Sequence, residues 1–541
     1  MMLLLIIIFI ILIIGLGYKS KRSLHMLQQN LYNENNRYIK WTIKNISNFL
    51  NREIIGIILF VLAYFVFYDL NIYLVPIELA ILVIYISMIR YWQNFFKNEQ
   101  TKKRLVITKR VKRLIVTIVI LYLIPLITLK TFTNQNLLLL LLIESIMVYL
   151  NEYVIFLAKI INTPIEKEVY NYYKHKAQKT LKSMPNLKIV GITGSYGKTS
   201  SKNILRDILN VKYNAFATPR NLNTYNGLIM SVNNYMDKFT DVFIAEMGAY
   251  VKGEIKGLCD LVHPKYGILT RIGTAHLETF GSEKNIEDGK FELIESLPSD
   301  GIGVLNKDDP KQKNHHIKNK VKLLWIGIDE ADVDVHAENI KCTNKGTTFD
   351  VTFKGDKNKY HFETRLLGRH NVYNILSSLA LGVAFGIDKE DLVHAVKGVK
   401  SVEHRLELKN MGSFYMIDDA YNSNPVGAKN AVEVLGMMPG VKVVVTPGMI
   451  ELGDKENYYN EEFGKQIADQ ADYVVLIGEE KTKPIYNGLL ESGFNKDKIT
   501  VYNDVRCAYT YINELKMKEK KDIYALFEND LPDTYNEEDK K

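Results

Sequence analysis

The sequence predicts an α-helical transmembrane region followed by an α/β part, in which a central P-loop domain precedes a smaller Rossmann-like α/β domain. Three observations lead to this fold class. Long apolar runs are confined to the first 160 of the 541 residues. A glycine-rich loop near residue 190 follows a short apolar segment and opens a helical one. From there onward, short β-rich runs alternate with amphipathic helical segments, as in proteins built on a parallel sheet.

The predicted membrane region contains five apolar segments, each near the roughly 20 residues that span a bilayer. They lie at about 2–18, 54–70, 72–90, 114–130 and 136–158. The first could be a signal peptide, but no basic residue precedes it and no small-residue cleavage site is evident, which favours an uncleaved anchor. Glu78 and Glu144 fall inside two segments. A carboxylate in hydrocarbon is costly, so each either faces a polar partner or lies near a membrane boundary.

The basic residues predict how these segments are oriented. Much of the net charge of +8 comes from two loops, 19–53 and 91–113, while the alternate connections are short and nearly uncharged. The positive-inside rule then places both loops and everything after about residue 160 in the cytoplasm, which predicts a multi-pass protein of the cell membrane. The charge is therefore interpreted as membrane topology, and no nucleic-acid partner is expected. Three widely separated cysteines fit a reducing compartment.

The soluble part is predicted to begin with a linker helix at 161–184 and a phosphate-binding loop. A strand candidate at 187–190 runs into Gly-Ile-Thr-Gly-Ser-Tyr-Gly-Lys-Thr-Ser at 191–200. Glycines let backbone N–H groups close on phosphate oxygens, and the helix N-terminus adds a favourable dipole. Lys198 is suited to neutralise β- and γ-phosphates, and the Thr199 hydroxyl to ligate Mg²⁺. The predicted phosphate-binding residues are Gly194, Ser195, Gly197, Lys198, Thr199 and Ser200.

The loop at 193–200 resembles the ATP loop of the Mur ligases, a family that adds amino acids to cell-wall muropeptides and includes folylpolyglutamate synthases. Further matches follow in the family's order: a strand ending at Glu246, a Thr-Ala-His-Leu-Glu string with His276, and Gly-Lys-Phe-Glu with Lys290. The resemblance implies two Mg²⁺ ions. Glu246 and Thr199 would bind one, and His276 the other, supported by Lys290 after carbamylation by carbon dioxide. Taken alone, His276 and Lys290 would be interpreted as solvated surface residues.

Later motifs imply how the nucleotide is held. Asn371 and Asn374, in a Gly-Arg-His-Asn-Val-Tyr-Asn string, are implied to contact the adenine and ribose. Arg405, in an Arg-Leu-Glu element, is implied to reach the ATP phosphates across a cleft. Asp419 would bind the ribose; it lies in Asp-Asp-Ala-Tyr-Asn-Ser-Asn-Pro, which is close to the element of the MurF type, the branch that adds D-alanyl-D-alanine.

The resemblance implies an ATP-dependent, ADP-forming ligase that joins a small amine donor, an amino acid or dipeptide, to a carboxylate of a cell-envelope precursor through an acyl phosphate. Its implied catalytic residues are Lys198, His276, Lys290 and Arg405. The predicted domains are a membrane domain at 1–160, a central ATP-binding domain at 185–400 and a C-terminal domain at 401–541. Strands are predicted in the last domain at 414–418, 441–446, 473–477, 499–502 and 523–527.

Two departures from the family pattern bear on the substrates. Only about 27 residues separate the last apolar segment from the phosphate strand, too few for the family's UDP-sugar domain. We therefore hypothesise that the acceptor substrate is linked to a lipid carrier. Residues 527–533 lack the Lys-Gly-Ser-like element of MurF-type enzymes, which leaves the amine donor open. Two alternatives remain: a folylpolyglutamate-synthase-like ligase, and a membrane scaffold or transporter with an ATP-binding regulatory domain.

Overall fold

The computed structural model describes residues 2–30, 36–44, 105–132, 137–420, 423–450 and 455–529, with a few isolated positions between them. The chain divides into two compact units, Met1–Tyr172 and Tyr173–Lys541. The predicted membrane segments at 54–70 and 72–90 lie largely outside the described residues, as do Glu78 and most of the basic loop that follows.

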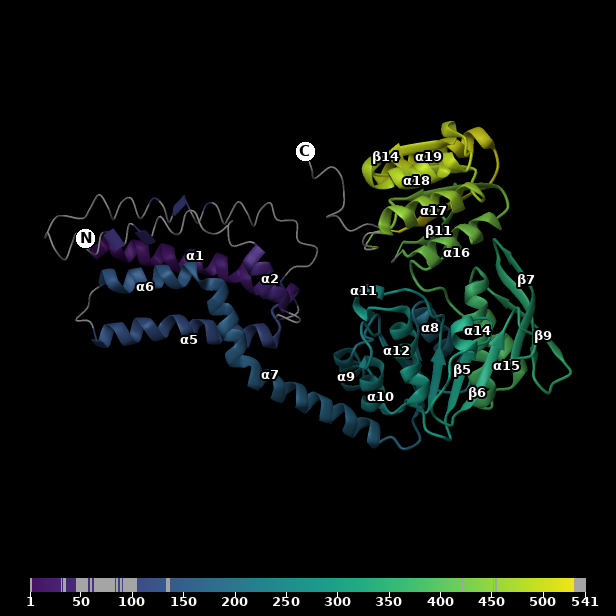
Figure 1. Cartoon of the computed structure of the whole chain (residues 1–541), viewed down its shortest axis with the longest axis horizontal. Helices are drawn as coiled ribbons and strands as arrows, with labels where there is room; N and C mark the ends of the chain where they lie inside the picture. The colour runs from purple at the N-terminus through teal and green to yellow at the C-terminus, as the bar shows by residue number, and fades with distance from the viewer. Residues whose placement is uncertain are drawn as a thin grey trace. The chain divides into compact units, whose positions relative to one another are not determined.

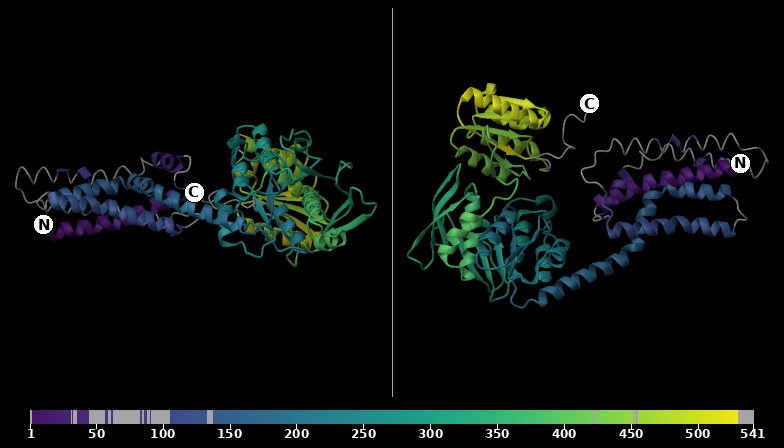
Figure 2. Two further views of the ribbon diagram at one scale, coloured as in Figure 1. Left: turned by 90° about the horizontal axis from the view of Figure 1, so that it is seen from below. Right: turned by 180° about the vertical axis from the view of Figure 1, so that it is seen from behind.

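Apolar side chains from the five helices described in the first unit form its core. Its described helices are α1 (Met2–Gln29), α2 (Arg37–Lys44), α5 (Lys109–Phe132), α6 (Leu137–Tyr149) and the first part of α7 (Asn151–Lys182). The helices α1, α5 and α6 lie side by side (Figure 1 and Figure 2). Ile8 and Leu12 of α1 pack in one buried cluster with Leu114 and Ile118 of α5.

The helix bounds of this unit differ from the predicted apolar segments. The first helix continues to Gln29. Within this continuation Lys19 is buried and donates a hydrogen bond of 2.9 Å to the Tyr149 carbonyl. The predicted segment at 136–158 is broken after Tyr149, where α6 and α7 meet at 77°. Among the described residues, no single helix is long and apolar enough to cross a membrane; the bent pair of α6 and α7 meets that test by length and composition. The predicted linker helix is the continuation of α7 to Lys182.

The second unit contains a nine-stranded sheet with the order β2-β3-β1-β4-β5-β6-β7-β8-β9. All neighbouring pairs from β2 to β7 are parallel, and β7, β8 and β9 are antiparallel. The strands are β1 (Lys188–Thr193), β2 (Ala215–Ala217), β3 (Val242–Glu246), β4 (Tyr266–Leu269), β5 (Ile302–Asn306), β6 (Lys322–Gly327), β7 (Val335–Thr343), β8 (Gly346–Phe353) and β9 (Lys359–Thr364).

Alternating side chains divide the core between the two faces of this sheet. On β1, Val190 and Ile192 belong to one cluster with helices α8, α14 and α15, while Ile189 belongs to the other with α9, α10 and α12. The helices are α8 (Lys198–Leu209), α9 (Tyr225–Asn234), α10 (Glu254–Val262), α11 (Leu277–Phe280), α12 (Glu283–Glu295), α13 (Pro310–Lys313), α14 (Arg369–Ala384) and α15 (Lys389–Gly398).

The C-terminal part of the second unit contains a six-stranded sheet with the order β10-β11-β15-β12-β13-β14, parallel except for β10. The five predicted strands are present, and β10 is an edge strand that was not predicted. Its strands are β10 (Glu407–Asn410), β11 (Tyr415–Asp419), β12 (Val441–Thr446), β13 (Tyr473–Ile477), β14 (Ile499–Tyr502) and β15 (Ile523–Glu528). Its helices are α16 (Pro425–Gly436), α17 (Glu456–Ala468), α18 (Glu479–Glu491) and α19 (Val505–Glu519), with a short 3₁₀ turn η3 (Lys496–Lys498).

Candidate active site

The phosphate loop connects the end of β1 to the start of α8. Gly194 and Gly197 both have positive φ, of 150° and 82°, which a side chain would strain. A Cβ at Gly194 would also lie 1.9 Å from the Thr270 hydroxyl, so the close packing of the loop on the end of β4 requires glycine there. The Ser195 hydroxyl donates 3.1 Å to the Gly273 carbonyl, and Ser200 lies half-buried in the first turn of α8.

Lys198 folds back over the loop that precedes it. Its ammonium donates to the carbonyls of Gly194 at 2.8 Å and Ser195 at 3.2 Å. Burial lowers the pKa of Lys198; Glu246 opposes this shift and Arg405 adds to it. Lys198 therefore lies within electrostatic range of a carboxylate at the end of β3 and of an arginine from the C-terminal part of the unit.

Glu246, the last residue of β3, is the centre of a buried polar cluster. The Thr199 hydroxyl donates to both carboxylate oxygens, at 3.1 and 3.2 Å, and the Asn223 amide donates at 3.1 Å. Lys202, one turn along α8, forms an ion pair with Glu246 at 2.8 Å, and both side chains are only 2% exposed. Thr199 and Glu246 were predicted from their motifs, whereas Lys202 and the contact of Asn223 were not.

His276 and Lys290 approach the loop from the segment after β4 and from α12. Partial burial lowers the pKa of His276, and so do the charges of Lys198 and Lys290, which lie nearby. Lys290 is 1% exposed, and among the described residues its ammonium has one hydrogen bond, of 3.4 Å, to the Ala249 carbonyl. Burial lowers the pKa of Lys290 to about 7, with a further contribution from Lys198. A large fraction of this amine is therefore neutral near pH 7.

Arg405 and Asp419 belong to the C-terminal part of the unit. Arg405 affects the pKa values of both Lys198 and Asp419, so it lies near both the phosphate loop and the end of β11. Burial raises the pKa of Asp419 to about 6, while Arg405 and the Leu406 N–H oppose that shift. The structure thus brings six predicted residues, Lys198, Glu246, His276, Lys290, Arg405 and Asp419, into one electrostatically connected group around the loop.

Asn371 and Asn374 lie in the first turns of α14, where it packs on α8. Both are 7% exposed. Asn374 accepts a hydrogen bond of 2.8 Å from the Ser201 hydroxyl and Asn371 donates 2.9 Å to the Leu367 carbonyl. The contact with Ser201 braces the helix that carries Lys198. The predicted contact of both asparagines with adenine and ribose stays a prediction.

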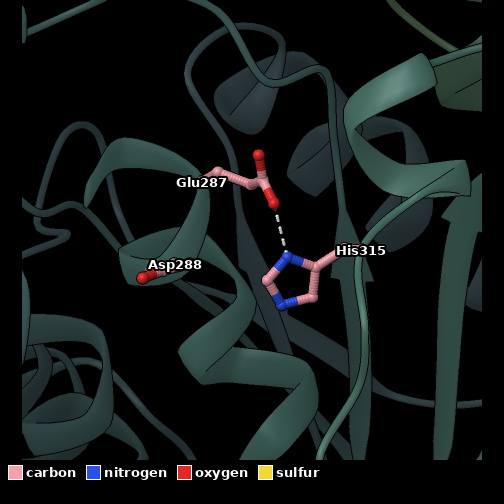
Figure 3. Close-up of side chains that lie close together, drawn as sticks. All are labelled: Glu287, Asp288 and His315. Carbon is pink, nitrogen blue, oxygen red and sulfur yellow. Dashed lines mark hydrogen bonds and ion pairs between the residues drawn. The ribbon is translucent and has the colours of Figure 1, made fainter. Parts of the chain in front are cut away.

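A second group of ligand-type side chains comes from α12 and from the segment after α13. Glu287, Asp288 and His315 have ligand atoms within 4.8 Å of one another, and Glu287 faces His315 at 2.6 Å (Figure 3). Asp288 is already paired with Lys252 at 2.9 Å and Lys284 at 3.2 Å. The His315 ring stacks on Phe291 at 3.6 Å, next to Lys290 in sequence. We interpret this group as an ion-pair cluster that braces α12, because cations already neutralise its carboxylates.

Glu528 ends β15 where the family element is missing, and the structure buries it completely. Its carboxyl group accepts hydrogen bonds from the hydroxyls of Ser423 and Thr446, and its register partner is Asp419. Burial raises the pKa of Glu528 to about 8, and the nearby Asp419 adds to the shift. A neutral carboxyl group that ties three strand ends together is therefore part of the folded state near pH 7.

Glu528→Gln is expected to change how stability depends on pH. The raised pKa means that the folded protein holds a proton that the unfolded chain releases between about pH 4.5 and 8. That contribution is complete below about pH 4.5 and is lost as the pH rises through about 8. The neutral amide should therefore make the variant more stable than the parent at pH 9, by up to about 5 kcal/mol, and not at pH 5.

Urea unfolding of both proteins at the two pH values measures this difference. Glu433→Gln is the matched control, because Glu433 is exposed in the same sheet domain and should show the same change at both pH values. An advantage of Glu528→Gln that is equal at pH 5 and pH 9 would contradict the expected protonation.

The fold and the site define a class of protein: a P-loop enzyme in which an arginine of a Rossmann-like second domain lies within electrostatic range of the phosphate-binding loop. A model of the Mur ligase middle domain matches residues 192–382, and a model of the Mur ligase glutamate ligase domain matches residues 404–526. The UDP-N-acetylmuramoyl-tripeptide--D-alanyl-D-alanine ligase of Bacillus subtilis (strain 168) is 33% identical over 321 residues, which are 59% of this chain and 68% of that one. The enzyme of the same name from Escherichia coli (strain K12) is 31% identical over 54% of this chain and 65% of that one.

The structure is also similar to solved structures. The crystal structure of MurF ligase from Thermotoga maritima in complex with ADP superimposes with a TM-score of 0.58 and 26% identity, over 66% of this chain and 80% of that one. The chain belongs to the Mur ligase family. It is an ATP-dependent acid–amino-acid ligase, MurF-like in its middle and C-terminal domains.

Proposed function

We propose that this ligase forms an amide bond between a carboxylate of a peptidoglycan-type precursor and a small amine, an amino acid or dipeptide, with release of ADP and phosphate. One observation carries the proposal: Glu246, His276, Lys290 and Arg405 come from separate elements and all lie within electrostatic range of Lys198. Side chains whose chemistry suits metal and phosphate binding thus lie around a single lysine, which supports the proposal. The names of the curated relatives support the precursor class.

The first step transfers the γ-phosphoryl group of ATP to the acceptor. A carboxylate oxygen of the acceptor attacks the γ-phosphorus, and the bond to the bridging oxygen breaks to release ADP. Negative charge accumulates on the phosphoryl oxygens and on the leaving oxygen. Lys198 and Arg405 would neutralise this charge, and the backbone N–H groups at the start of α8 would hold the phosphates in line.

The second step forms the amide. The nitrogen of the neutral amine attacks the acyl carbon, the carbon–oxygen bond to phosphate breaks, and the amine loses one proton. Phosphate is a far better leaving group than oxide, which is why the carboxylate must first be phosphorylated. Lys198 and Arg405 would also neutralise the departing phosphate.

The donor set at the loop fits a magnesium ion. Cis oxygens of an octahedral Mg²⁺ ion with bonds of 2.0–2.1 Å lie roughly 2.9 Å apart. The Thr199 hydroxyl already lies 3.1 Å from a Glu246 oxygen, so both could share one ion with little movement. His276 would serve a second ion as a neutral imidazole, which agrees with its lowered pKa. Such ions would supply charge neutralisation for the phosphates.

Carbamylation of Lys290 is the second part of the metal proposal. A buried ammonium beside Lys198 and His276 would repel a second cation. The neutral amine can instead attack carbon dioxide: an N–C bond forms, one proton leaves, and the side chain becomes an anionic carbamate. The pKa of about 7 supports this, because the reaction requires the unprotonated amine.

The ligase assay uses the purified full chain with ATP, a precursor acceptor and a panel of amines that includes D-alanyl-D-alanine. We expect ADP release only when acceptor and amine are both present, and a product whose mass equals acceptor plus amine minus water. ADP release that is independent of the amine would favour the alternative of an ATP-binding regulatory domain on a membrane protein. Glutamate addition to a folate acceptor would favour the folylpolyglutamate-synthase-like alternative.

We further propose that the first unit attaches the enzyme to the cytoplasmic face of the cell membrane, so that the acceptor is a lipid-linked precursor. Apolar side chains on its helices are exposed, among them Ile10 at 50% on α1 and Val116 at 58% on α5. Apolar side chains exposed along two helices favour a lipid or protein partner. The sequence's basic loops support the cytoplasmic orientation.

Membrane attachment is tested on cell fractions. The full chain should sediment with membranes and stay there after alkaline carbonate washing, but dissolve in detergent. A chain that is recovered in the supernatant would end this part of the proposal and leave the ligase assignment intact. The carrier is tested separately, by comparing turnover of UDP-linked and lipid-linked acceptors; turnover of the UDP-linked form alone would overturn the lipid-linked hypothesis.

A further inference from the structure

Lys202 forms an ion pair with Glu246, the carboxylate that the proposed function assigns to magnesium binding. Its ammonium lies 2.8 Å from a Glu246 oxygen and donates 2.7 Å to the Arg220 carbonyl. Lys202 comes three residues after Thr199, so both side chains leave α8 on the same face and meet the same carboxylate. The phosphate-loop motif does not require a lysine at this place, and the mechanism above makes no use of it.

The pair is buried deeply enough for its charges to matter. Both side chains are 2% exposed, so water screens their attraction poorly. Removing one partner of such a pair leaves an uncompensated charge in the interior, which is strongly destabilising. Before a metal binds, the lysine therefore compensates most of the charge of Glu246.

The same contacts position the carboxylate. Asn223 donates to Glu246 from the loop after β2, and the Thr218 hydroxyl accepts a hydrogen bond of 3.2 Å from the Glu246 N–H. Lys202 ties this loop to α8 through the carbonyl of Arg220, which has a positive φ of 48°. The carboxylate is thus held beside the Thr199 hydroxyl by groups on two segments, α8 and the loop after β2.

We propose that Lys202 is a positioning residue that acts as an internal counter-ion: it holds Glu246 in the metal-binding position but keeps the site from retaining a divalent cation until a nucleotide brings its phosphates. A Glu246 that is already neutralised attracts a lone divalent cation weakly. The polyphosphate of the nucleotide supplies the missing negative charge, so metal and nucleotide enter together. This inference rests on the proposed metal-binding role of Glu246.

The test measures Mn²⁺ binding to the full chain without nucleotide, by the loss of the free-ion signal in electron paramagnetic resonance. Lys202→Met should bind Mn²⁺ at least about ten-fold more tightly than the parent. Removing a unit charge beside Glu246 changes the interaction energy of the bound ion by more than the roughly 1.4 kcal/mol to which a ten-fold change corresponds. Lys202→Arg keeps the charge and should resemble the parent, and Lys238→Met, an exposed lysine of the same domain, is the matched control. Lys202→Met combined with Glu246→Gln should lose the gain.

Thermal unfolding supplies a second readout and a safeguard against poor folding. Mn²⁺ alone should raise the melting temperature of Lys202→Met more than that of the parent, and Lys202→Gln, which keeps a hydrogen-bond donor without the charge, should behave in the same way. Equal Mn²⁺ affinities in the parent and both neutral variants would overturn the inference. If the parent binds no Mn²⁺ even with ATP, the proposed metal site itself fails. If the parent binds Mn²⁺ together with ATP but the neutral variants show no gain in Mn²⁺ affinity, the metal site stands and only the role of Lys202 is overturned.

Discussion

Lys198→Met should lower kcat/KM for ADP formation by about 10³-fold or more, which corresponds to roughly 4 kcal/mol of transition-state stabilisation. The ammonium lies at the mouth of the loop, donating to the carbonyls of Gly194 and Ser195, where it would meet the β- and γ-phosphates. Because phosphoryl transfer gathers negative charge at these oxygens, an uncharged side chain of similar length removes stabilisation where it is needed most. The measurement is steady-state ADP release with saturating acceptor and amine.

Two variants make this result specific to the charge at that position. Lys238→Met removes an exposed lysine from the same domain and should keep full activity. Lys198→Arg keeps the charge, but its larger planar head does not fit between two loop carbonyls, so only partial activity is expected. Near-parental activity of Lys198→Met would mean that nucleotide chemistry occurs elsewhere in the chain.

Lys290→Ala is the second change with a large expected effect, a loss of about 10²-fold or more in kcat. The substitution removes the group that would become a carbamate and leaves a small cavity near Phe280, whose ring centroid lies 5.2 Å from the lysine nitrogen. A short carboxylate such as acetate or formate should enter that cavity and restore part of the activity. The measurement is ADP release as a function of added carboxylate, with chloride at the same ionic strength as the control.

The carbamate explanation also predicts a pH and carbon dioxide dependence for the parent. The amine, with a pKa of about 7, becomes protonated and unreactive as the pH falls below that value. Activity in carbon-dioxide-depleted buffer should therefore fall more steeply below pH 7 than activity with added bicarbonate. Lys290→Arg should be inactive and should not respond to carboxylates, because the guanidinium both fills the cavity and keeps the positive charge. Rescue of Lys290→Arg by acetate would contradict this explanation.

Much of the second unit could be predicted from local patterns. Alternating apolar runs indicated the strands of the C-terminal sheet, and Gly-Lys-Thr after an apolar strand indicated the loop that the structure builds at Gly194–Thr199. These features depend on neighbours in sequence: short continuous apolar runs for buried strands, and glycine where φ is positive. The edge strand β10 was missed because its residues, Glu407–Asn410, are mostly polar and only partly buried.

The N-terminal unit shows where local patterns were insufficient. The apolar pattern predicted segments at 2–18 and 136–158. The first lies within a longer helix that continues to Gln29, and the second is broken after Tyr149. Hydropathy averages side chains along the chain, but buried Lys19 donates its hydrogen bond to a carbonyl 130 positions away in sequence. A contact of that kind leaves no signal in a hydropathy window.

By itself, the sequence determined the order of the motifs, the chemistry of each residue type and the family to which they point, because these depend on residue identity and spacing. Only the tertiary structure decided that Glu246, His276, Lys290 and Arg405 surround Lys198, that Lys202 neutralises Glu246, and that Glu528 is a buried neutral acid. The physical reason is that charge interactions and burial depend on distances in space. Those distances are created when parallel strands bring their carboxyl ends to one edge of a sheet.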